Sequence, residues 1–597
     1  MSRSANTKTI AKAAVLVMTF FALSRFLGVL RDVVIASQFG ASAPYDAYLA
    51  AFRAPDLLFN LISGGALGSA FIPTFTGYLS RNDETGAWRL ASAIINWVLV
   101  IAIGVGVLAA IFAPWLVENL IAPGFEDAAQ INLTVQLMRW LLFSTVIFGV
   151  SGVLMGILNA RQHFLLPALA PVVYNLSIIA GAWFLGPIWG VKGLAFGVVM
   201  GSLGHLLIQV PKVFAYGLNY QFILAPGDPG VREVARLMAP RVIGIAAIQL
   251  NFVWDTFLAS WLTEGSIATL DYGRRVMLLP VGIVSQAVAT AAFPTFAALA
   301  AKRSWDELQD AFIATLRSIL YLTVPATIGL VMLGRPIIQA LYQRNAFTEV
   351  STQNTVWALW FYSIGLVAHS MVEILTRAFY SLHNTRAPVI VGVISMGVNI
   401  LLSLLLMQVF AGLNLAPHGG IALASAIAII IEMVWLMLVL KRLPGKLSVR
   451  ALKDALPPIL FSGLAMAAVL GAFLFAFGDS NAWLTASGGI VVGGIVYVLV
   501  SYALGAAEPG SGYFFNAHPL DLTGNALSAL CRTGTLVLAG LVGDCWPGGG
   551  RRLFVSSLCF GWPAPLDADD VAGSGYQRSD CLGISGRAIV LAGNRRG

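Results

Sequence analysis

The sequence predicts an all-α protein that crosses a membrane many times, and three observations support this fold class. Of its 597 residues, 58% are hydrophobic and 11% are charged, whereas soluble domains carry about 45–50% apolar and about 25% charged residues. The mean hydropathy is +0.82. Long apolar segments recur between residues 10 and 505 and lack the alternation expected of transmembrane β-strands. The composition therefore excludes a string of soluble domains.

Fourteen apolar segments are each long enough to cross the membrane as a helix, because about 20 apolar residues span the ~30 Å hydrocarbon layer. Glycine and proline occur within them, which membrane helices tolerate better than soluble ones. The sequence therefore predicts about 14 transmembrane helices, at 10–37, 47–79, 91–117, 131–158, 165–186, 191–216, 235–262, 267–300, 312–341, 353–381, 387–412, 418–441, 456–477 and 483–505.

The distribution of charge predicts the orientation of these helices. Cytoplasmic connections of membrane proteins favour Lys and Arg, and basic residues predominate in alternate connections here, most densely at Lys441–Lys453. The connections between them carry mainly acidic residues, such as Glu118 and Asp127. The first segment resembles a signal peptide, but its apolar stretch continues past Arg25 and is too long for a cleavable one. Both termini are therefore predicted to be cytoplasmic.

An internal repeat divides the sequence. Ser69–Phe75 recurs as Thr290–Phe296 at an offset of 221 residues, and the same offset places Pro167 on Pro388. Six predicted spans fit into one offset, so the two copies run in the same direction, related by an axis along the membrane normal. We therefore expect two parallel six-helix repeats around a central cavity, and two further helices: an N-lobe (1–220), a C-lobe (221–445) and spans 13–14 (446–505).

The segment 506–597 differs in composition from the rest. It contains all four cysteines and no lysine, and it is rich in glycine. The cysteine spacings of 14, 14 and 22 residues match no close-pair zinc motif. Two interpretations stay open, a cytoplasmic or disordered extension and the product of a reading-frame change near codon 506. A metal or redox function is disfavoured, and no function is assigned to this segment.

The first predicted span contains the densest set of charges. Ionisable groups inside a membrane are costly and usually face a partner or a wet cavity. Arg25 and Asp32 are seven residues apart, and Arg31 lies within about 60° of Arg25 on the helix. One Asp cannot neutralise both arginines, which favours a site for an anionic substrate over a structural ion pair or snorkelling. Guanidinium suits phosphate because it donates paired hydrogen bonds and stays charged.

The second and eighth spans carry further candidates. Arg53 follows Asp46 by seven residues, so both lie on one helix face. The repeat offset places Arg53 on Arg274, which is followed by Arg275. Like charge at equivalent positions of both lobes is hard to explain as ion pairing. We therefore expect these residues to contribute to the anion site.

Three other intramembrane groups are candidates for gating or for structural ion pairs. Asp255 lies in span seven, and Glu373 and Arg377 lie four residues apart in span ten. That spacing suits an internal ion pair on one helix. Asp32 is also a candidate for such a role.

Several classes of function are disfavoured. The sequence contains no GxxxxGK[ST] phosphate loop, and its six histidines form no HExxH motif. We therefore expect a transporter rather than an enzyme, with no metal and no cofactor. The net charge of +8 is spread over loops, so no nucleic-acid partner is expected.

Several motifs resemble those of one family. They are Ser24–Asp32 (SRFLGVLRD), Asp46–Tyr48 (DAY), Gly65–Pro73 (GALGSAFIP) and Arg377–Pro388 (RAFYSLHNTRAP). On these motifs, residues 10–505 resemble the MurJ (MviN) lipid II flippases, within the superfamily of multidrug, oligosaccharidyl-lipid and polysaccharide exporters.

The resemblance implies a function in cell wall biosynthesis. A member of this family would move undecaprenyl-diphosphate-linked peptidoglycan precursor across the bacterial cytoplasmic membrane by alternating access. Membrane potential or an ion gradient would drive transport, and wall-synthesis proteins are candidate partners. The family's cationic cavity is matched here at Arg25, Arg31, Asp46 and Arg275.

The sequence departs from the family pattern at several cavity positions. Phe59, Asn60 and Gly64 replace basic residues and a Glu of span two. In span eight, Arg274-Arg275 replaces an Asp–Arg pair, and Leu278 replaces a Glu. We therefore expect fewer carboxylates in this cavity, with Arg53 and Arg274 adding positive charge.

Other functions compete with lipid II transport. The same fold could export another lipid-linked oligosaccharide or cationic drugs, although cationic drugs would favour a cavity with net carboxylate. A membrane-embedded enzyme acting on lipid-linked sugars and a scaffold for wall-synthesis proteins are further alternatives.

Overall fold

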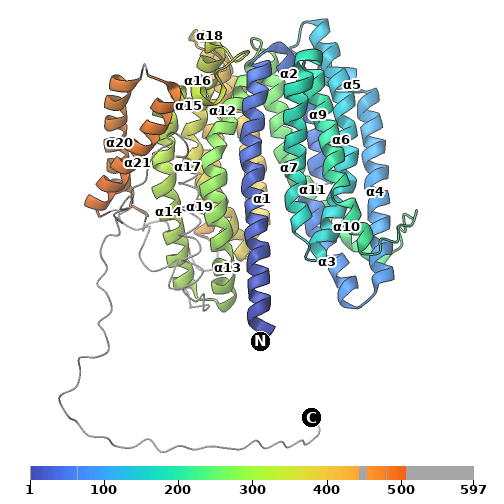
Figure 1. Cartoon of the computed structure of the whole chain (residues 1–597). Helices are drawn as coiled ribbons and strands as arrows, with labels where there is room; N and C mark the ends of the chain where they lie inside the picture. Colours follow the sequence, from blue (N-terminus) through green and yellow to red (C-terminus); the bar gives the residue numbers. More distant parts are fainter. Residues whose placement is uncertain (1, 63–64, 443–451, 454, 479, 506–597) are drawn as a thin grey trace, which may run out of the picture. The chain divides into compact units, whose positions relative to one another are not determined.

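The computed structural model describes residues 2–62, 65–442, 452–453, 455–478 and 480–505, and the predicted tail at 506–597 lies outside them. Within these ranges the regular elements are helices, joined by short connections (Figure 1). Aspartates cap several helix starts: Asp83, Asp127 and Asp228 each accept a hydrogen bond from a backbone N–H two or three residues later. These caps satisfy N–H groups that a helix start leaves without a partner.

The first half of the chain forms ten α-helices and two π-helical turns in the described residues. They are α1 (Ser2–Phe39), α2 (Ala43–Ile62), α3 (Gly65–Ser80), α4 (Glu84–Ile111), α5 (Ala113–Leu116), η1 (Val117–Ile121), α6 (Ala128–Ala160), α7 (Leu165–Ala180), η2 (Gly181–Leu185), α8 (Gly186–Trp189), α9 (Val191–Leu207) and α10 (Val210–Ala215).

The second half continues in the same way. Its described elements are α11 (Pro229–Ser260), α12 (Ser266–Pro280), η3 (Val281–Ser285), α13 (Gln286–Lys302), α14 (Trp305–Met332), α15 (Gly334–Tyr342), α16 (Glu349–Ile364), α17 (Leu366–Ser381), α18 (Arg386–Gly412), α19 (His418–Leu440), α20 (Leu456–Phe477) and α21 (Ala482–Ala503).

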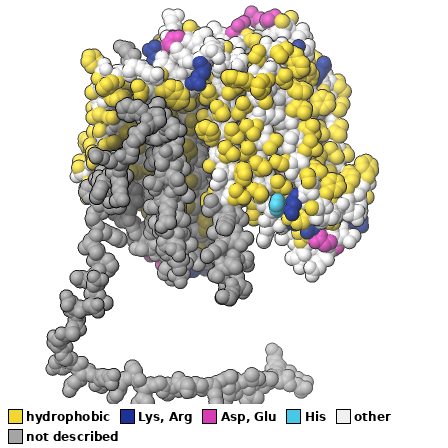
Figure 2. All heavy atoms as spheres, viewed as in Figure 1, with side chains coloured by type: hydrophobic (Ala, Val, Ile, Leu, Met, Phe, Trp, Pro, Cys, Tyr) yellow, Lys and Arg dark blue, Asp and Glu magenta, His cyan; other side chains and the backbone are white. Residues whose placement is uncertain are grey.

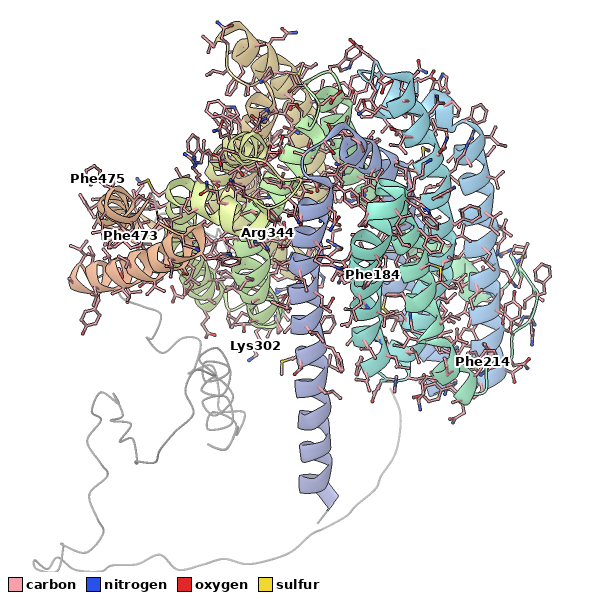
Figure 3. The ribbon with its side chains drawn as sticks, turned by 45° about the horizontal axis from the view of Figure 1, so that its top comes forward. Phe184, Phe214, Lys302, Arg344, Phe473 and Phe475 are labelled. Carbon is pink, nitrogen blue, oxygen red and sulfur yellow. The ribbon has the colours of Figure 1, made fainter. Side chains whose placement is uncertain are left out.

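Helices cover each of the 14 predicted ranges. Among the described residues, 12 spans are long and apolar enough to cross a membrane, or 13 if the bent pair α16–α17 is one span. The prediction of an all-helical multi-pass membrane protein is confirmed, and the count of 14 stays a prediction. Large apolar side chains cover much of the surface (Figure 2). Phe475 is 96% exposed and Phe184 is 69% exposed (Figure 3), as lipid contact allows.

The repeated motifs occupy equivalent helices. Ser69–Phe75 lies in α3 and Thr290–Phe296 lies in α13, and each of these helices is the second part of a broken segment. Pro167 and Pro388 are each the third residue of their helices, α7 and α18. The lobe boundaries themselves stay a prediction.

Three of the four buried hydrophobic clusters in the described residues show how the two halves pack. One contains Phe71 and Phe75 of the first half, and another contains Phe312 and Phe379 of the second half. The third contains residues of both halves, including Tyr45, whose ring stacks on that of Tyr272 with centroids 5.5 Å apart. The two halves therefore share a packed core, beside which the charged residues meet.

The connection between the halves is fixed to the first half. The Asn96 amide donates hydrogen bonds to the carbonyls of Gln221 (3.0 Å) and Ile223 (2.8 Å), and the Trp97 indole donates to Leu224 (2.8 Å). The start of α11 also joins the first-half cluster through Val231 and Val234. The start of α11 therefore packs as part of the first half.

Candidate functional site

The centre of the candidate site is an ion pair that joins the two halves. On α1, Arg31 donates to its neighbour Asp32 through Nε (3.0 Å) and Nη2 (2.9 Å). On α12, Arg275 donates through Nη1 to both oxygens of Asp32, at 3.1 and 3.2 Å. Asp32 is therefore shared between two guanidiniums, one from each half. The remaining Nη1 of Arg31 donates to Asn175 on α7 (3.1 Å).

A second carboxylate continues this arrangement along α12. Asp271, whose side chain is 4% exposed, accepts from Arg275 Nε at 2.5 Å and from Arg274 Nη2 at 3.3 Å. These pairs have the i,i+4 and i,i+3 spacing at which helix side chains meet. The Arg274 guanidinium also lies over the Phe252 ring, 4.4 Å from its centroid. Arg31, Asp32, Arg275, Asp271 and Arg274 form a continuous charged network, which we call the guanidinium cluster.

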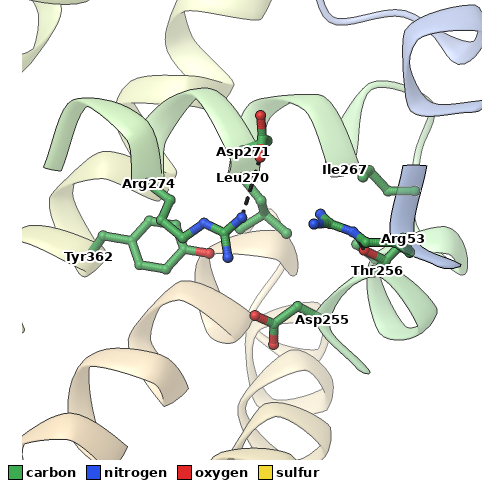
Figure 4. A pocket seen from close by; sticks show the side chains of 9 residues that line it. Arg53, Asp255, Thr256, Ile267, Leu270, Asp271, Arg274 and Tyr362 are labelled. Atoms are coloured by element: carbon green, nitrogen blue, oxygen red, sulfur yellow. Dashed lines mark hydrogen bonds and ion pairs between the residues drawn. The ribbon is translucent and has the colours of Figure 1, made fainter. Parts of the chain in front are cut away.

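The repeat-related residues Arg53 and Arg274 line one small pocket (Figure 4). Their guanidiniums point toward one another, with Asp255 beside them. Arg53 Nε donates to the Thr256 hydroxyl at 2.6 Å, and no carboxylate among the described residues lies within ion-pair distance of Arg53. Asp255 Oδ1 is buried without a hydrogen-bond partner among those residues. The pocket measures about 10 Å³, room for about one water molecule.

Sequence reasoning missed a carboxylate on the same helix as Arg53. Asp56 accepts from Gln249 of α11 at 2.9 Å and from Asn60 at 3.1 Å. Its position three residues after Arg53 could have revealed it, because residues at that spacing are neighbours on a helix. Thr256 and Asn175 had no comparable signal, since their partners lie 203 and 144 residues away.

Asp46 does not join the guanidinium cluster, contrary to expectation. It is 2% exposed, and its carboxylate accepts from the backbone N–H groups of Gly265 (2.7 Å) and Ala268 (2.8 Å). These groups form the start of α12, where carboxylates stabilise the unpaired N–H groups and the helix dipole. Asp46 therefore links the two halves as a helix cap supplied from another element.

Further contacts close the same region, which we call the distal seam. It joins residues 37–46 of the first half to residues 265–272 and 345–346 of the second, at the end of α1. The Ser37 carbonyl accepts from Ala346 N–H at 3.1 Å, and Asn345 donates to the Ser37 hydroxyl at 2.8 Å. Gly40 has φ +59°, and a Cβ there would lie 2.2 Å from the Ala346 oxygen. Only glycine fits this position.

Arg25 stands apart from the ion pairs. It is exposed on α1, and no hydrogen bond or ion pair holds its guanidinium within the described part of the chain. It lies against η3, since a Cβ added to Gly282 would be 3.4 Å from Arg25 Nη1. Arg25 is therefore free to bind an incoming anion without breaking an existing pair.

The other predicted residues lie elsewhere. Glu373 and Arg377 are half-buried on α17, and the ion pair that their spacing suggested is not formed in this structure; Arg377 Nε is buried without a partner among the described residues. Of the departures from the family pattern, Phe59 packs on Phe148 with centroids 5.1 Å apart, and Leu278 is 40% exposed. Gly64 lies outside the described residues.

Four carboxylates lie among the five arginines of the site. Five guanidiniums (Arg25, Arg31, Arg53, Arg274 and Arg275) are accompanied by Asp32, Asp56, Asp255 and Asp271. The pairs that Asp32 and Asp271 make with Arg31 and Arg275 join side chains, so the oxygens of a phosphate group can take the place of the carboxylate oxygens. The chemistry available is therefore anion binding by partner exchange.

A helical membrane protein with repeated motifs and a charged network between its halves has the architecture of a transporter. A family model described as lipid II flippase MurJ matches residues 35–487 of the chain. The chain therefore belongs to the MurJ family of lipid II flippases, which are transporters and not enzymes.

Curated relatives and solved structures agree with this assignment. The chain is 30% identical over 448 residues to a probable lipid II flippase MurJ of Vibrio cholerae, covering 72% of this chain and 82% of the relative. It is 31% identical over 474 residues to that of Bdellovibrio bacteriovorus, covering 78% and 88%. A solved structure titled "Lipid II flippase MurJ, inward closed conformation" matches with a TM-score of 0.70 and 28% identity, covering 82% of this chain and 98% of that one.

A more distant match shows the shared fold alone. An inward-facing transporter of the MATE family of the MOP superfamily has a TM-score of 0.57 and 16% identity to the chain, covering 74% of this chain and 99% of that one.

Proposed function

We propose that this chain moves lipid II, the undecaprenyl-diphosphate-linked disaccharide-pentapeptide, from the inner to the outer leaflet of the bacterial cytoplasmic membrane. Membership of the lipid II flippase family is the main support for this proposal. The guanidinium cluster supports it independently, because a diphosphate is the part of lipid II that arginines recognise best.

Diphosphate binding would begin at Arg25. This guanidinium has no ion-pair partner among the described residues, whereas Arg31 and Arg275 both bind Asp32. A diphosphate arriving between the halves would then compete with Asp32 for Arg31 and with Asp271 for Arg275. Asp32 would keep Arg275 and Asp271 would keep Arg274, so neither carboxylate would be left buried without an ionic partner. Arg53 and Arg274 would join only after their pocket of about 10 Å³ widens.

Alternating access would require the distal seam to open. The distribution of basic residues supports an orientation in which α1 begins in the cytoplasm, so the seam at its far end would close the site toward the outside. Opening would break the Asp46 cap on α12 and the contacts of Ser37 with Asn345 and Ala346. The two states need to differ by only a few kcal/mol for cycling. A membrane potential or an ion gradient would bias this equilibrium.

Lipid II exposed on the cell surface is the direct readout of this function. In cells depleted of their own flippase, the full chain is expected to restore labelling of lipid II by an impermeant reagent, and Arg25→Ala with Arg31→Ala is expected to abolish it. Arg335→Gln is the matched control, because Arg335 pairs with Glu349 on an exposed surface. Full labelling by a well-expressed double variant would contradict the proposal. Residues 1–505 alone would test whether the tail is needed.

A further inference from the structure

A second cavity lies within the second half, away from the guanidinium cluster. Its volume is about 500 Å³, and it is lined by residues of α14, α17, α19 and the start of α20 together with Lys441, Leu452 and Lys453 outside these helices. Seven of these residues are apolar, and three of the seven are Met371, Met433 and Met437. The other two are Lys441 and Lys453. No carboxylate occurs among the described lining residues.

The cavity runs from the helix ends into the depth of the membrane. Lys441 directly follows the last residue of α19, and Lys453 lies three residues before α20. Leu320, which also lines the cavity, is 15 residues into α14, or about 22 Å from the start of that helix at 1.5 Å per residue. Both lysines therefore lie near helix ends, with Leu452 and Leu456 close to Lys453 in the sequence, whereas Leu320 lies far along α14.

The residues that line this cavity favour an amphiphilic ligand. Methionine side chains are flexible and polarisable, and they adapt to ligands without a fixed shape, such as a hydrocarbon chain. Both lysines are exposed, so their ammonium groups can bind an anionic group at the membrane surface while their stems cover apolar atoms. A volume of about 500 Å³ lies within the range of single small-ligand sites, which suits one chain rather than a whole lipid.

The surrounding charge narrows the choice of ligand. Lys441 and Lys453 are the charged residues of the described lining, which contains no carboxylate to neutralise them. Basic clusters next to a membrane helix attract anionic lipids, and basic pockets between helices bind their head groups.

We propose that this cavity binds one acyl chain of an anionic phospholipid, whose phosphate lies on Lys441 and Lys453. The acyl chain would lie against Met433 and Met437 of α19 and Leu320 of α14. The orientation proposed above would place this lipid in the inner leaflet. Only this choice of leaflet rests on the proposed orientation. Binding itself is independent of lipid II transport, so failure of one proposal leaves the other standing.

Photo-crosslinking on the full chain tests this site. The protein is placed in phosphatidylcholine nanodiscs that contain a trace of phosphatidylglycerol with a photoactivatable group on its acyl chain. We expect labelled peptides to include Met433 and Met437, and labelling to fall at least fivefold with excess unlabelled phosphatidylglycerol but not with added phosphatidylcholine. Lys441→Gln with Lys453→Gln is expected to reduce labelling at least fivefold. Lys302→Gln, at the exposed end of α13 (Figure 3), is the control and should change nothing.

Three results would overturn the proposal. Unchanged labelling of a folded variant that carries both lysine substitutions would show that the lipid contacts this surface without binding at a specific site. Displacement by a polyprenyl phosphate and not by phosphatidylglycerol would assign the cavity to an isoprenoid chain. A crosslink from the cavity to residues 506–597 would show that the chain fills it itself. Met437→Trp provides a second variant, since it fills the cavity, leaves both lysines in place and is expected to reduce labelling.

Discussion

Asp46 and Asp32 both link the two halves, but they do so in different ways. Asp46, in the distal seam, accepts from backbone N–H groups at the start of α12. Asp32, in the guanidinium cluster, accepts from the side chains of Arg31 and Arg275. Backbone groups move only with their helix, whereas a guanidinium can turn to another anion. We therefore expect the seam to respond to the position of whole helices and the cluster to respond to the charge of a ligand.

The two links also differ in the free energy that their loss is expected to cost. Removing a helix cap costs about 0.5–2 kcal/mol, which shifts an equilibrium by a factor of up to about 30. Breaking a buried ion pair by deleting one partner costs about 3–5 kcal/mol, because the other charge stays behind. The following substitutions test this distinction, in order of decreasing expected effect.

Arg275→Ala is expected to have the largest effect. It removes the guanidinium that binds both Asp32 and Asp271, so two carboxylates lose a partner. Because Arg275 is 35% exposed, we expect a destabilisation near the lower end of about 3–5 kcal/mol, with loss of lipid II flipping. Thermal unfolding in detergent and surface labelling of lipid II measure the two effects. Arg275→Lys keeps the charge without the paired donors and should recover stability more than flipping. Wild-type stability of the Ala variant would show that the cluster is not an energetic unit.

Gly40→Ala is expected to open the distal seam without changing any charge. Its φ of +59° costs a residue with a Cβ about 1–2 kcal/mol, and the clash with the Ala346 oxygen adds to this. A cysteine introduced near the seam should become accessible to an impermeant thiol reagent from outside. Gly217→Ala, also at positive φ but with no atom within 4 Å of its Cβ, controls for backbone strain. Equal accessibility in the two variants would contradict a specific role for Gly40.

Asp46→Ala should loosen the same seam by less. Losing the α12 cap is expected to cost about 1–2 kcal/mol, and the same accessibility assay should report a shift of roughly 5–30-fold. Asp127→Ala removes a cap within the first half, where Asp127 accepts from Ala129 N–H at 2.9 Å. That control should lower helix stability without exposing the seam. If both variants expose it alike, Asp46 acts only through general stability.

Glu373→Gln should have the smallest effect. No ion pair joins Glu373 to Arg377 in the described part of the chain, so we expect less than a twofold change in flipping. Arg377→Gln removes the other side chain and allows a double-mutant cycle. A coupling free energy above about 1 kcal/mol between the two substitutions would show that Glu373 and Arg377 interact, as their spacing suggested.

The amino-acid sequence by itself determined the membrane helices, the repeated motifs and the arginines that the site contains. These are local properties: apolar length defines a span, and an offset of 221 residues places Arg53 on Arg274. The family resemblance, confirmed by the comparisons, also rests on short motifs within single helices. The fold class and the function could therefore be predicted without coordinates.

Only the tertiary structure decided which partner each charge has. Asp46 meets Gly265, 219 residues away, and Asp32 meets Arg275, 243 residues away. Helix spacing places a residue on a face but does not say which neighbour that face meets, because the rotation of each helix depends on packing against all the others. For this reason Asp46 became a cap instead of a cavity residue, and Glu373 did not pair with Arg377. Sequence supplied the charges, and packing between distant helices fixed their partners.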